Sequence, residues 1–96
     1  MIERTFTITG RLGLHARAAA KLVRLTSEFQ SDISLRRPDG NLTADAKSIL
    51  SVLMLAASRG TELQACVEGA DEELAMNAMA ELFADGFGEF EAEPSL

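Results

Sequence analysis

The sequence has no tryptophan, no tyrosine, one cysteine, one histidine and two prolines in 96 residues. Its single cysteine, Cys66, excludes an intrachain disulfide. A secreted chain of this length usually carries several cysteines, so we expect a cytoplasmic protein. Without Trp or Tyr, a sheet that stacks nucleic-acid bases is not expected. No apolar run approaches the roughly 20 residues that span a bilayer, and the alternating start Met1–Arg4 lacks a signal-peptide core, so we expect neither membrane insertion nor export.

Two kinds of ligand motif are also missing. One histidine and one cysteine among scattered acids give no recognisable metal-ligand spacing, so no metal is expected. The glycine-containing segment 10–14 has neither the spacing nor the Lys-Ser/Thr of a Walker motif, and no GxGxxG occurs. We therefore expect no cofactor.

Charge is divided unevenly along the chain. The formal net charge is −6, yet residues 1–60 carry nine basic and five acidic side chains, whereas residues 61–96 carry ten acidic and no basic ones. An acidic chain does not offer the sustained basic surface that nonspecific nucleic-acid binding needs. A local basic patch in the first half remains available for an anionic ligand or an acidic protein.

The pattern of apolar residues predicts seven elements in the order βαββαβα. Alternation predicts strands over residues 2–9, 32–36, 42–44 and 62–68, with a hairpin turn at 38–41. Helical spacing predicts helices over 16–29, over 47–57 with Gly60 as the C-terminal cap, and from about residue 71. The last of these helices is expected to bury one stripe of side chains: Leu74, Ala78, Met79, Leu82 and Phe83.

Half-buried strands of this kind favour an α+β fold. An antiparallel sheet with one apolar face requires helices on that face only, which gives an open two-layer sandwich. The length suits one domain, which we place at residues 1–88. Residues 89–96 are acidic and poor in apolar residues, so we expect a flexible tail.

His15 is the only histidine, and it lies where the first strand gives way to a helix. Side chains just before a helix face unpaired backbone N–H groups and the positive end of the helix dipole, where an anion is favoured. Neutral imidazole is a competent nucleophile near pH 7. This position suits a phosphorylated histidine, although in most cases a lone histidine in a small protein is a surface or capping residue.

Three basic residues follow His15 at helical spacing: Arg17, Lys21 and Arg24. Arg17 is close enough in sequence to reach phosphate oxygens, and phosphoryl transfer needs mainly positioning and charge neutralisation. An ordinary solvated helix face would have the same composition. The pattern alone does not choose between a site and a surface.

The segment Gly13-Leu14-His15-Ala16-Arg17-Ala18-Ala19 resembles the HPr family, the histidine-containing phosphocarriers of the bacterial phosphotransferase system. The resemblance continues through residues 46–50 and 69–72 and covers about residues 2–88. It implies the HPr-like βαββαβα sandwich, with a four-stranded antiparallel sheet covered on one face by three helices. Residues 48–55 and 82–87 are more similar to the nitrogen-branch type, NPr, than to the sugar-branch type.

The resemblance implies roles for individual residues. His15 would be phosphorylated at Nδ1, and Arg17 would assist the phosphoryl group. Ser48 matches a serine that a dedicated HPr kinase/phosphorylase modifies in some bacteria, although it also suits an N-terminal helix cap. Ala18 departs from the family, which usually has proline there; a loss of proline loosens the backbone without removing a reacting group.

The family resemblance also implies partners. The donor would be enzyme I or its nitrogen-branch counterpart, and the acceptor an enzyme IIA. Acidic partners would dock on a monomeric carrier that turns over no small molecule by itself. The alternative is a regulatory binding module of the same fold that acts through Ser48 or through docking alone. The partner-binding residues implied are Lys21, Arg24, Lys47, Ile49, Leu50 and Leu53.

Overall fold

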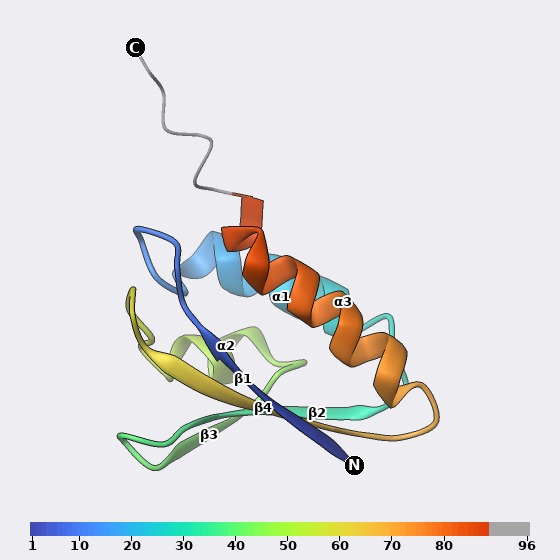
Figure 1. Cartoon of the computed structure of the whole chain (residues 1–96). Coiled ribbons are helices and arrows are strands. Elements are labelled where there is room, and N and C mark those ends of the chain that lie inside the picture. Colours follow the sequence, from blue (N-terminus) through green and yellow to red (C-terminus); the bar gives the residue numbers. More distant parts are fainter. Residues whose placement is uncertain (89–96) are drawn as a thin grey trace.

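A computed structural model describes residues 1–88 of the chain, and the predicted tail 89–96 lies outside the described residues. The elements follow the predicted order (Figure 1). Their bounds are β1 (Ile2–Thr7), α1 (Ala16–Thr26), β2 (Asp32–Arg37), β3 (Leu42–Asp45), α2 (Ile49–Leu53), β4 (Glu62–Glu68), α3 (Glu72–Ala84) and a short 3₁₀ turn, η1 (Gly86–Gly88).

The four strands form one antiparallel sheet in the order β1-β4-β2-β3. In β4, Leu63, Ala65 and Val67 are fully buried, while Glu62 and Glu68 are exposed. Such alternation gives the sheet one apolar face, and α1, α2 and α3 all lie on that face (Figure 1). The predicted α+β open two-layer sandwich is therefore confirmed.

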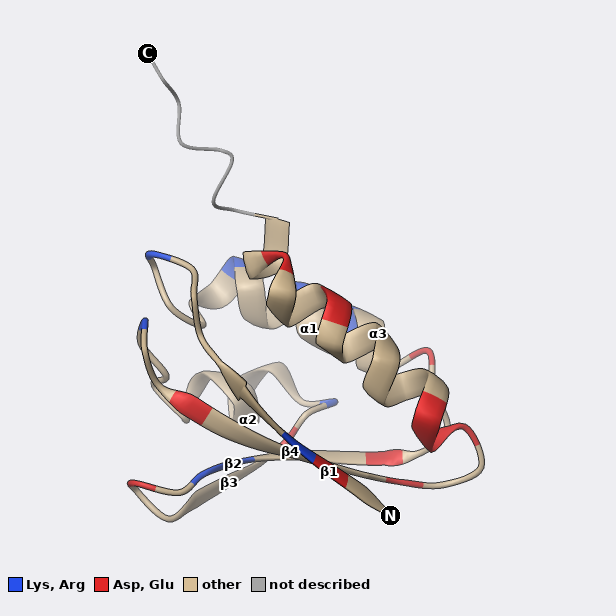
Figure 2. Cartoon of the chain, viewed as in Figure 1, with Lys and Arg blue, Asp and Glu red and all other residues tan. Residues whose placement is uncertain are grey.

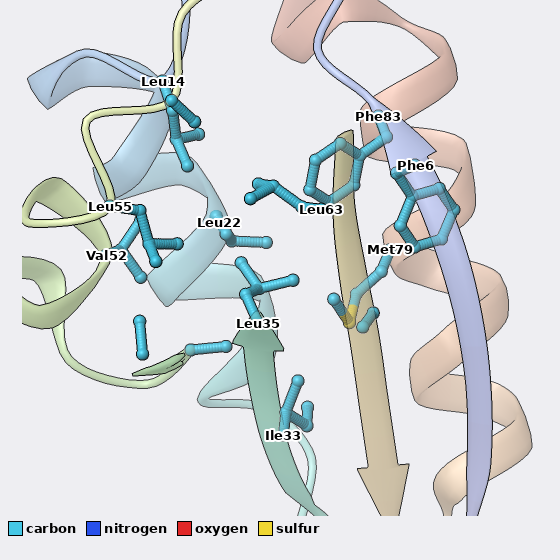
Figure 3. Packing of buried hydrophobic residues seen from close by; sticks show 14 of the residues in the cluster. Phe6, Leu14, Leu22, Ile33, Leu35, Val52, Leu55, Leu63, Met79 and Phe83 are labelled. Carbon is cyan, nitrogen blue, oxygen red and sulfur yellow. The ribbon is translucent and has the colours of Figure 1, made fainter. Parts of the chain in front are cut away.

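The core fills the space between this sheet face and the helices. Leu22 of α1, Val52 of α2 and Leu35 of β2 are completely buried and meet near its middle (Figure 3). Where α3 packs on β1, the rings of Phe6 and Phe83 stack with their centroids 4.6 Å apart. Apolar burial on this scale is the main force that holds helices and sheet together.

The first predicted helix and strand are each slightly too long. α1 ends at Thr26 instead of residue 29, and β1 ends at Thr7 instead of residue 9. The Thr26 hydroxyl is buried and donates a hydrogen bond to the Ala46 carbonyl at 2.7 Å. This tertiary contact pins the helix end to the segment before α2, so local periodicity does not reveal it.

The prediction of a long second helix is wrong. α2 ends at Leu53, and the chain then turns through Ala56, whose φ is +51°. The Arg37 guanidinium donates at 2.9 Å to the carbonyls of both Leu55 and Ala56. Arg37 of β2 thus supplies hydrogen bonds to carbonyls of the turn that follows α2 and holds the chain in this turn.

The proposed C-terminal cap at Gly60 is therefore also wrong. Gly60 has a φ of +92° and lies in the turn before β4. Its N–H donates to the Ile8 carbonyl at 2.8 Å, which links this turn to the end of β1.

The buried stripe of α3 is rotated relative to the prediction. Ala75, Met76, Met79 and Phe83 are buried, whereas Leu74 is 67% exposed. Ala78 and Leu82 are only half-buried. Apolar residues occupy most sides of this helix, so the sequence offers more than one possible stripe, and packing on β1 and β4 selects one.

Candidate functional site

The loop before α1 is tied to the segment before β4. The Leu14 N–H donates to the Ala57 carbonyl at 2.8 Å, and the Leu14 side chain is buried. Gly13 has a φ of +68°, and a Cβ atom there would lie 2.7 Å from the Ala57 carbonyl oxygen. Glycine is needed at this position for both its backbone conformation and the close approach. These contacts fix where α1 begins and therefore where His15 lies.

His15 is the N-cap residue of α1. Its backbone is extended, and its carbonyl accepts the Ala19 N–H at 2.8 Å, the first hydrogen bond of the helix. Its Nδ1 atom accepts the Arg17 backbone N–H at 3.3 Å. A nitrogen that accepts a hydrogen bond carries its lone pair there, so the Nδ1 lone pair of this half-buried ring faces the first turn of α1.

The 3.3 Å bond between Nδ1 and Arg17 is long for a hydrogen bond between nitrogen atoms in a helix cap. The contact is therefore a weak helix cap. A phosphoryl group attached to Nδ1 would place its oxygens near the N–H groups of the first turn, which lack partners within the helix. No acidic residue occupies that turn.

The three predicted basic residues of α1 differ in their surroundings. Arg17 and Arg24 are exposed. Lys21 is half-buried, and its ammonium donates to the Phe87 carbonyl at 2.7 Å. Lys21 thus ties α1 to η1 in addition to contributing positive charge.

Two further arginines near the site were not predicted. Arg11 lies in the loop that precedes His15, and Arg59 lies in the 57–60 segment that contacts Gly13 and Leu14. Both are exposed. Basic ribbon segments gather at the end of the molecule where α1 begins (Figure 2). We call Arg11, Arg17, Lys21, Arg24 and Arg59 together the cationic surface.

Arg11 could have been found from its distance of four residues from His15. Arg59 gives no such signal, because it is 44 positions away in sequence and comes near through the contact between two loops. Only the folded chain brings the loop of Arg59 against the loop before His15.

The α2 region carries an apolar surface. Ile49 and Leu50 are 42% and 67% exposed, and Leu53 is half-buried. Met54, which was not predicted, is 73% exposed. Since α2 packs on α1, these side chains form an apolar patch beside the helix that begins at His15.

Lys47 and Ser48 precede α2. The Lys47 ammonium donates to the Phe29 carbonyl at 2.8 Å, beyond the C-terminal end of α1. The Ser48 hydroxyl accepts the Ser51 N–H at 3.3 Å, which makes Ser48 the N-cap of α2. Because α1 spans eleven residues, or about 16 Å, Lys47 is bound at the end of α1 opposite to His15.

Cys66 lies on the open sheet face, away from the helices. Burial and the neighbouring Glu3 carboxylate raise the pKa of its thiol, so it stays protonated near neutral pH. It is therefore a poor nucleophile compared with the Nδ1 atom of His15.

Two kinds of feature are absent from residues 1–88. In residues 1–88, no three His, Cys, Asp or Glu side chains are grouped so that they could hold a metal ion. Over the same residues, no helix has the length and apolar character needed to cross a membrane.

Proteins of known families are similar to this chain over almost its whole length. The family model described as the PTS HPr component phosphorylation site matches residues 2–85. The chain is 47% identical to phosphocarrier protein HPr of Xylella fastidiosa over 93% of this chain and 98% of that protein. It is 38% identical to phosphocarrier protein NPr of Escherichia coli over 92% of this chain and 97% of that protein.

A solved structure has the same fold. The crystal structure of HPr from Thermoanaerobacter tengcongensis superimposes with a TM-score of 0.87 at 39% identity, covering 93% of this chain and 98% of that one. The fold resemblance therefore extends over almost the whole of both chains.

Proposed function

Because the chain belongs to the HPr family of the phosphotransferase system, we propose that it is a phosphocarrier that takes a phosphoryl group from phospho-enzyme I on His15 and gives it to an enzyme IIA. The observation that carries this proposal is the position of Nδ1. It accepts a hydrogen bond from the first turn of α1, at a helix end that carries no acidic residue.

The proposed chemistry uses few groups. The Nδ1 lone pair attacks phosphorus, a P–N bond forms, and the bond between phosphorus and the donor breaks with its electron pair leaving on the donor. Arg17 and the backbone N–H groups of the first turn neutralise charge on the phosphoryl oxygens. The reverse sequence delivers the group to the acceptor, so the protein acts as a carrier with a phosphohistidine intermediate.

Partner recognition follows from the surface around His15. Enzyme I and enzyme IIA proteins are the partners that membership of the HPr family implies. We propose that the cationic surface attracts acidic patches on both partners and that Ile49, Leu50, Leu53 and Met54 supply the apolar contact. Lys47 is expected to contribute less, since it already binds the Phe29 carbonyl.

The test is phosphorylation from phosphoenolpyruvate with a purified enzyme I. We expect an acid-labile phosphate on the parent protein and none on His15→Ala, while Ser48→Ala serves as the matched control and is labelled normally. Absence of label with an active donor would overturn the carrier proposal. If His15→Ala still performed the cellular role, the regulatory binding module would be favoured instead.

The two branches of the phosphotransferase system use different donors. Relatives of both the HPr and the NPr type match the chain. We propose the nitrogen branch from the resemblance in residues 48–55 and 82–87. A faster initial rate of His15 phosphorylation by the nitrogen-branch donor than by enzyme I would support it, and the opposite order would assign the sugar branch.

Regulation at Ser48 is a separate proposal. A phosphate on this N-cap hydroxyl would lie at the start of α2 beside the exposed Ile49 and Leu50, and would add negative charge to the apolar patch. Incubation with an HPr kinase and ATP should give an acid-stable phosphate that is absent from Ser48→Ala. Equal labelling of both proteins would remove Ser48 as the target.

A further inference from the structure

The C-terminal end of the described chain returns to α1. Phe87 is 2% exposed, and its ring packs edge-on against Phe83 with the centroids 5.0 Å apart. The Lys21 ammonium holds the Phe87 carbonyl at 2.7 Å. The chain therefore leaves the domain at Gly88 beside α1, and Figure 1 shows this exit near the start of that helix.

The segment that follows Gly88 has the charge opposite to that of its surroundings. Residues 89–96 contain three glutamates, Glu89, Glu91 and Glu93, and no basic residue. Of the cationic surface, Lys21 lies at the exit, and Arg17 and Arg24 lie on the same helix. Arg11 and Arg59 lie in the two loops that meet at the start of that helix. The family model ends at residue 85, so the acidic segment lies beyond the part of the chain that defines the family.

We propose that residues 89–96 dock on the cationic surface of the same molecule and compete there with acidic partner proteins. The docking itself rests only on charge and geometry, whereas the competition rests on the phosphocarrier function proposed above. The bound segment would be held by several exposed ion pairs, each weak alone, and by the high effective concentration of a short tether.

The length of the segment is sufficient. Eight residues span at most about 26–29 Å when extended. Lys21, which holds Phe87, is one turn of α1 from Arg17, a rise of about 6 Å. The three glutamates can therefore reach the side chains around His15 without unfolding η1.

Other surfaces near the exit are less suitable. The groove between α1 and α3 contains Lys21 and Arg24, but Glu28, Glu81 and Asp85 also line it. The hollow on the open sheet face is lined by Asp32, Asp45 and Glu68 and by one basic side chain, Lys47. In both linings acidic side chains outnumber basic ones, so both are less favourable for three glutamates than the cationic surface, which contains no acid.

The test places a nitroxide on the segment and reads its position by NMR. In a Cys66→Ser background, Ser95→Cys carries the label, and paramagnetic broadening is measured for backbone amides. We expect broadening of the amides of residues 11–24 and 57–60 at low ionic strength. It should fall at about 1 M salt, where the Debye length is about 3 Å.

The matched control neutralises the segment within the full chain, with Glu89→Gln, Glu91→Gln and Glu93→Gln combined. This variant should lose the broadening while its remaining amide shifts stay those of the parent. Absence of broadening at residues 11–24 in the parent would overturn the proposal, as would broadening centred on residues 78–85 or unaffected by the three substitutions.

Phosphorylation provides a second measurement. If docking competes with partners, the triple glutamine variant should show a KM for enzyme I about threefold lower than the parent at low ionic strength. Equal KM values would overturn the competition. Broadening without any phosphorylation of His15 would leave docking intact and reject the phosphocarrier function, so the two failures are distinguishable.

Discussion

The starts of α1 and α3 are built alike but used differently. Each is preceded, two residues before its N-cap, by a glycine that packs against another backbone segment: Gly13 against Ala57, and Gly69 against Ser31. Gly13 has a φ of +68° and Gly69 a φ of +154°, so both positions require glycine. Each glycine thus fixes where a helix begins relative to a distant loop.

The two N-termini differ in how their positive ends are compensated. The first turn of α3 contains Glu72 and Glu73, and the Glu72 carboxylate accepts the Gly69 N–H at 3.1 Å. The first turn of α1 contains no acid, and its cap is the weak contact from Arg17 to His15 Nδ1. The positive end of α3 is compensated by acids of its own first turn, whereas the first turn of α1 supplies none.

The N-cap side chains show the same contrast. Asp71, at the start of α3, makes no cap bond within its own helix. It accepts the N–H groups of Gln30 and Ser31 and the Ser31 hydroxyl, and so binds the loop after α1. The hydrogen bonds from Ser31 and Gln30 hold the pKa of the Asp71 carboxyl below its usual value. Asp71 thus connects two distant segments, whereas the printed contact of the His15 ring stays within the first turn of its own helix.

The strongest test of this comparison places an acid in the first turn of α1. Arg17→Glu should lower kcat/KM for phosphorylation of His15 by about 100-fold or more, because a phosphoryl-binding cation becomes a like charge. The measurement is the initial rate with phosphoenolpyruvate and enzyme I.

The control changes charge in the first turn of the other helix. Glu73→Lys should leave the rate of His15 phosphorylation unchanged, since the proposed site lies at the start of α1 and Glu73 lies in the first turn of α3. An equal loss of rate in both variants would mean that net charge, and not the position at α1, controls the reaction.

Substitution of the two glycines, Gly13 and Gly69, should distinguish an effect on stability from an effect on phosphorylation. Gly13→Ala and Gly69→Ala should each destabilise the fold by about 1–3 kcal/mol, because a Cβ would meet backbone atoms in a strained conformation. Urea unfolding measures this loss. Under conditions where both variants are folded, only Gly13→Ala should slow phosphorylation of His15; normal transfer in that variant would contradict the role of Gly13 in placing the site.

The Asp71 carboxyl should make the fold sensitive to acid. Because its pKa is lowered in the folded state, it stabilises the protein above its unfolded pKa of about 4, and this contribution is lost as pH falls through the folded pKa. Asp71→Asn should therefore show lower stability at neutral pH and a shallower decline below about pH 4, measured by urea unfolding at several pH values. Identical pH profiles in parent and variant would contradict this.

The smallest effect on stability is expected from a substitution in the turn after α2, where the residue with a positive φ is an alanine and not a glycine. Ala56 has a φ of +51°, a conformation that costs L-residues about 1–2 kcal/mol. Ala56→Gly should stabilise the fold by at most about 1 kcal/mol after the greater flexibility of unfolded glycine is subtracted. Differential scanning calorimetry should show a higher Tm, and a lower one would contradict the argument.

The candidate site was partly predictable because some of its signals are local. His15, Arg17 and the helix start are within a few residues of one another, so spacing alone suggested a nucleophile at a helix N-terminus. Arg59 and the binding of Lys21 to Phe87 depend on segments distant in sequence. Met54 was overlooked because the predicted helix was too long, which hid the exposed turn at its true end.

The amino-acid sequence by itself determined the order of elements, the apolar face of each strand and the position of His15, because these follow from alternation, helical spacing and glycine over short distances. Only the tertiary structure decided where α2 ends, which stripe of α3 is buried and what Asp71 binds. Each of those outcomes depends on a partner from another part of the chain: Arg37 for α2, the sheet for α3, and Ser31 for Asp71. Local patterns carry no information about such partners, because the contacts form only when distant segments pack together.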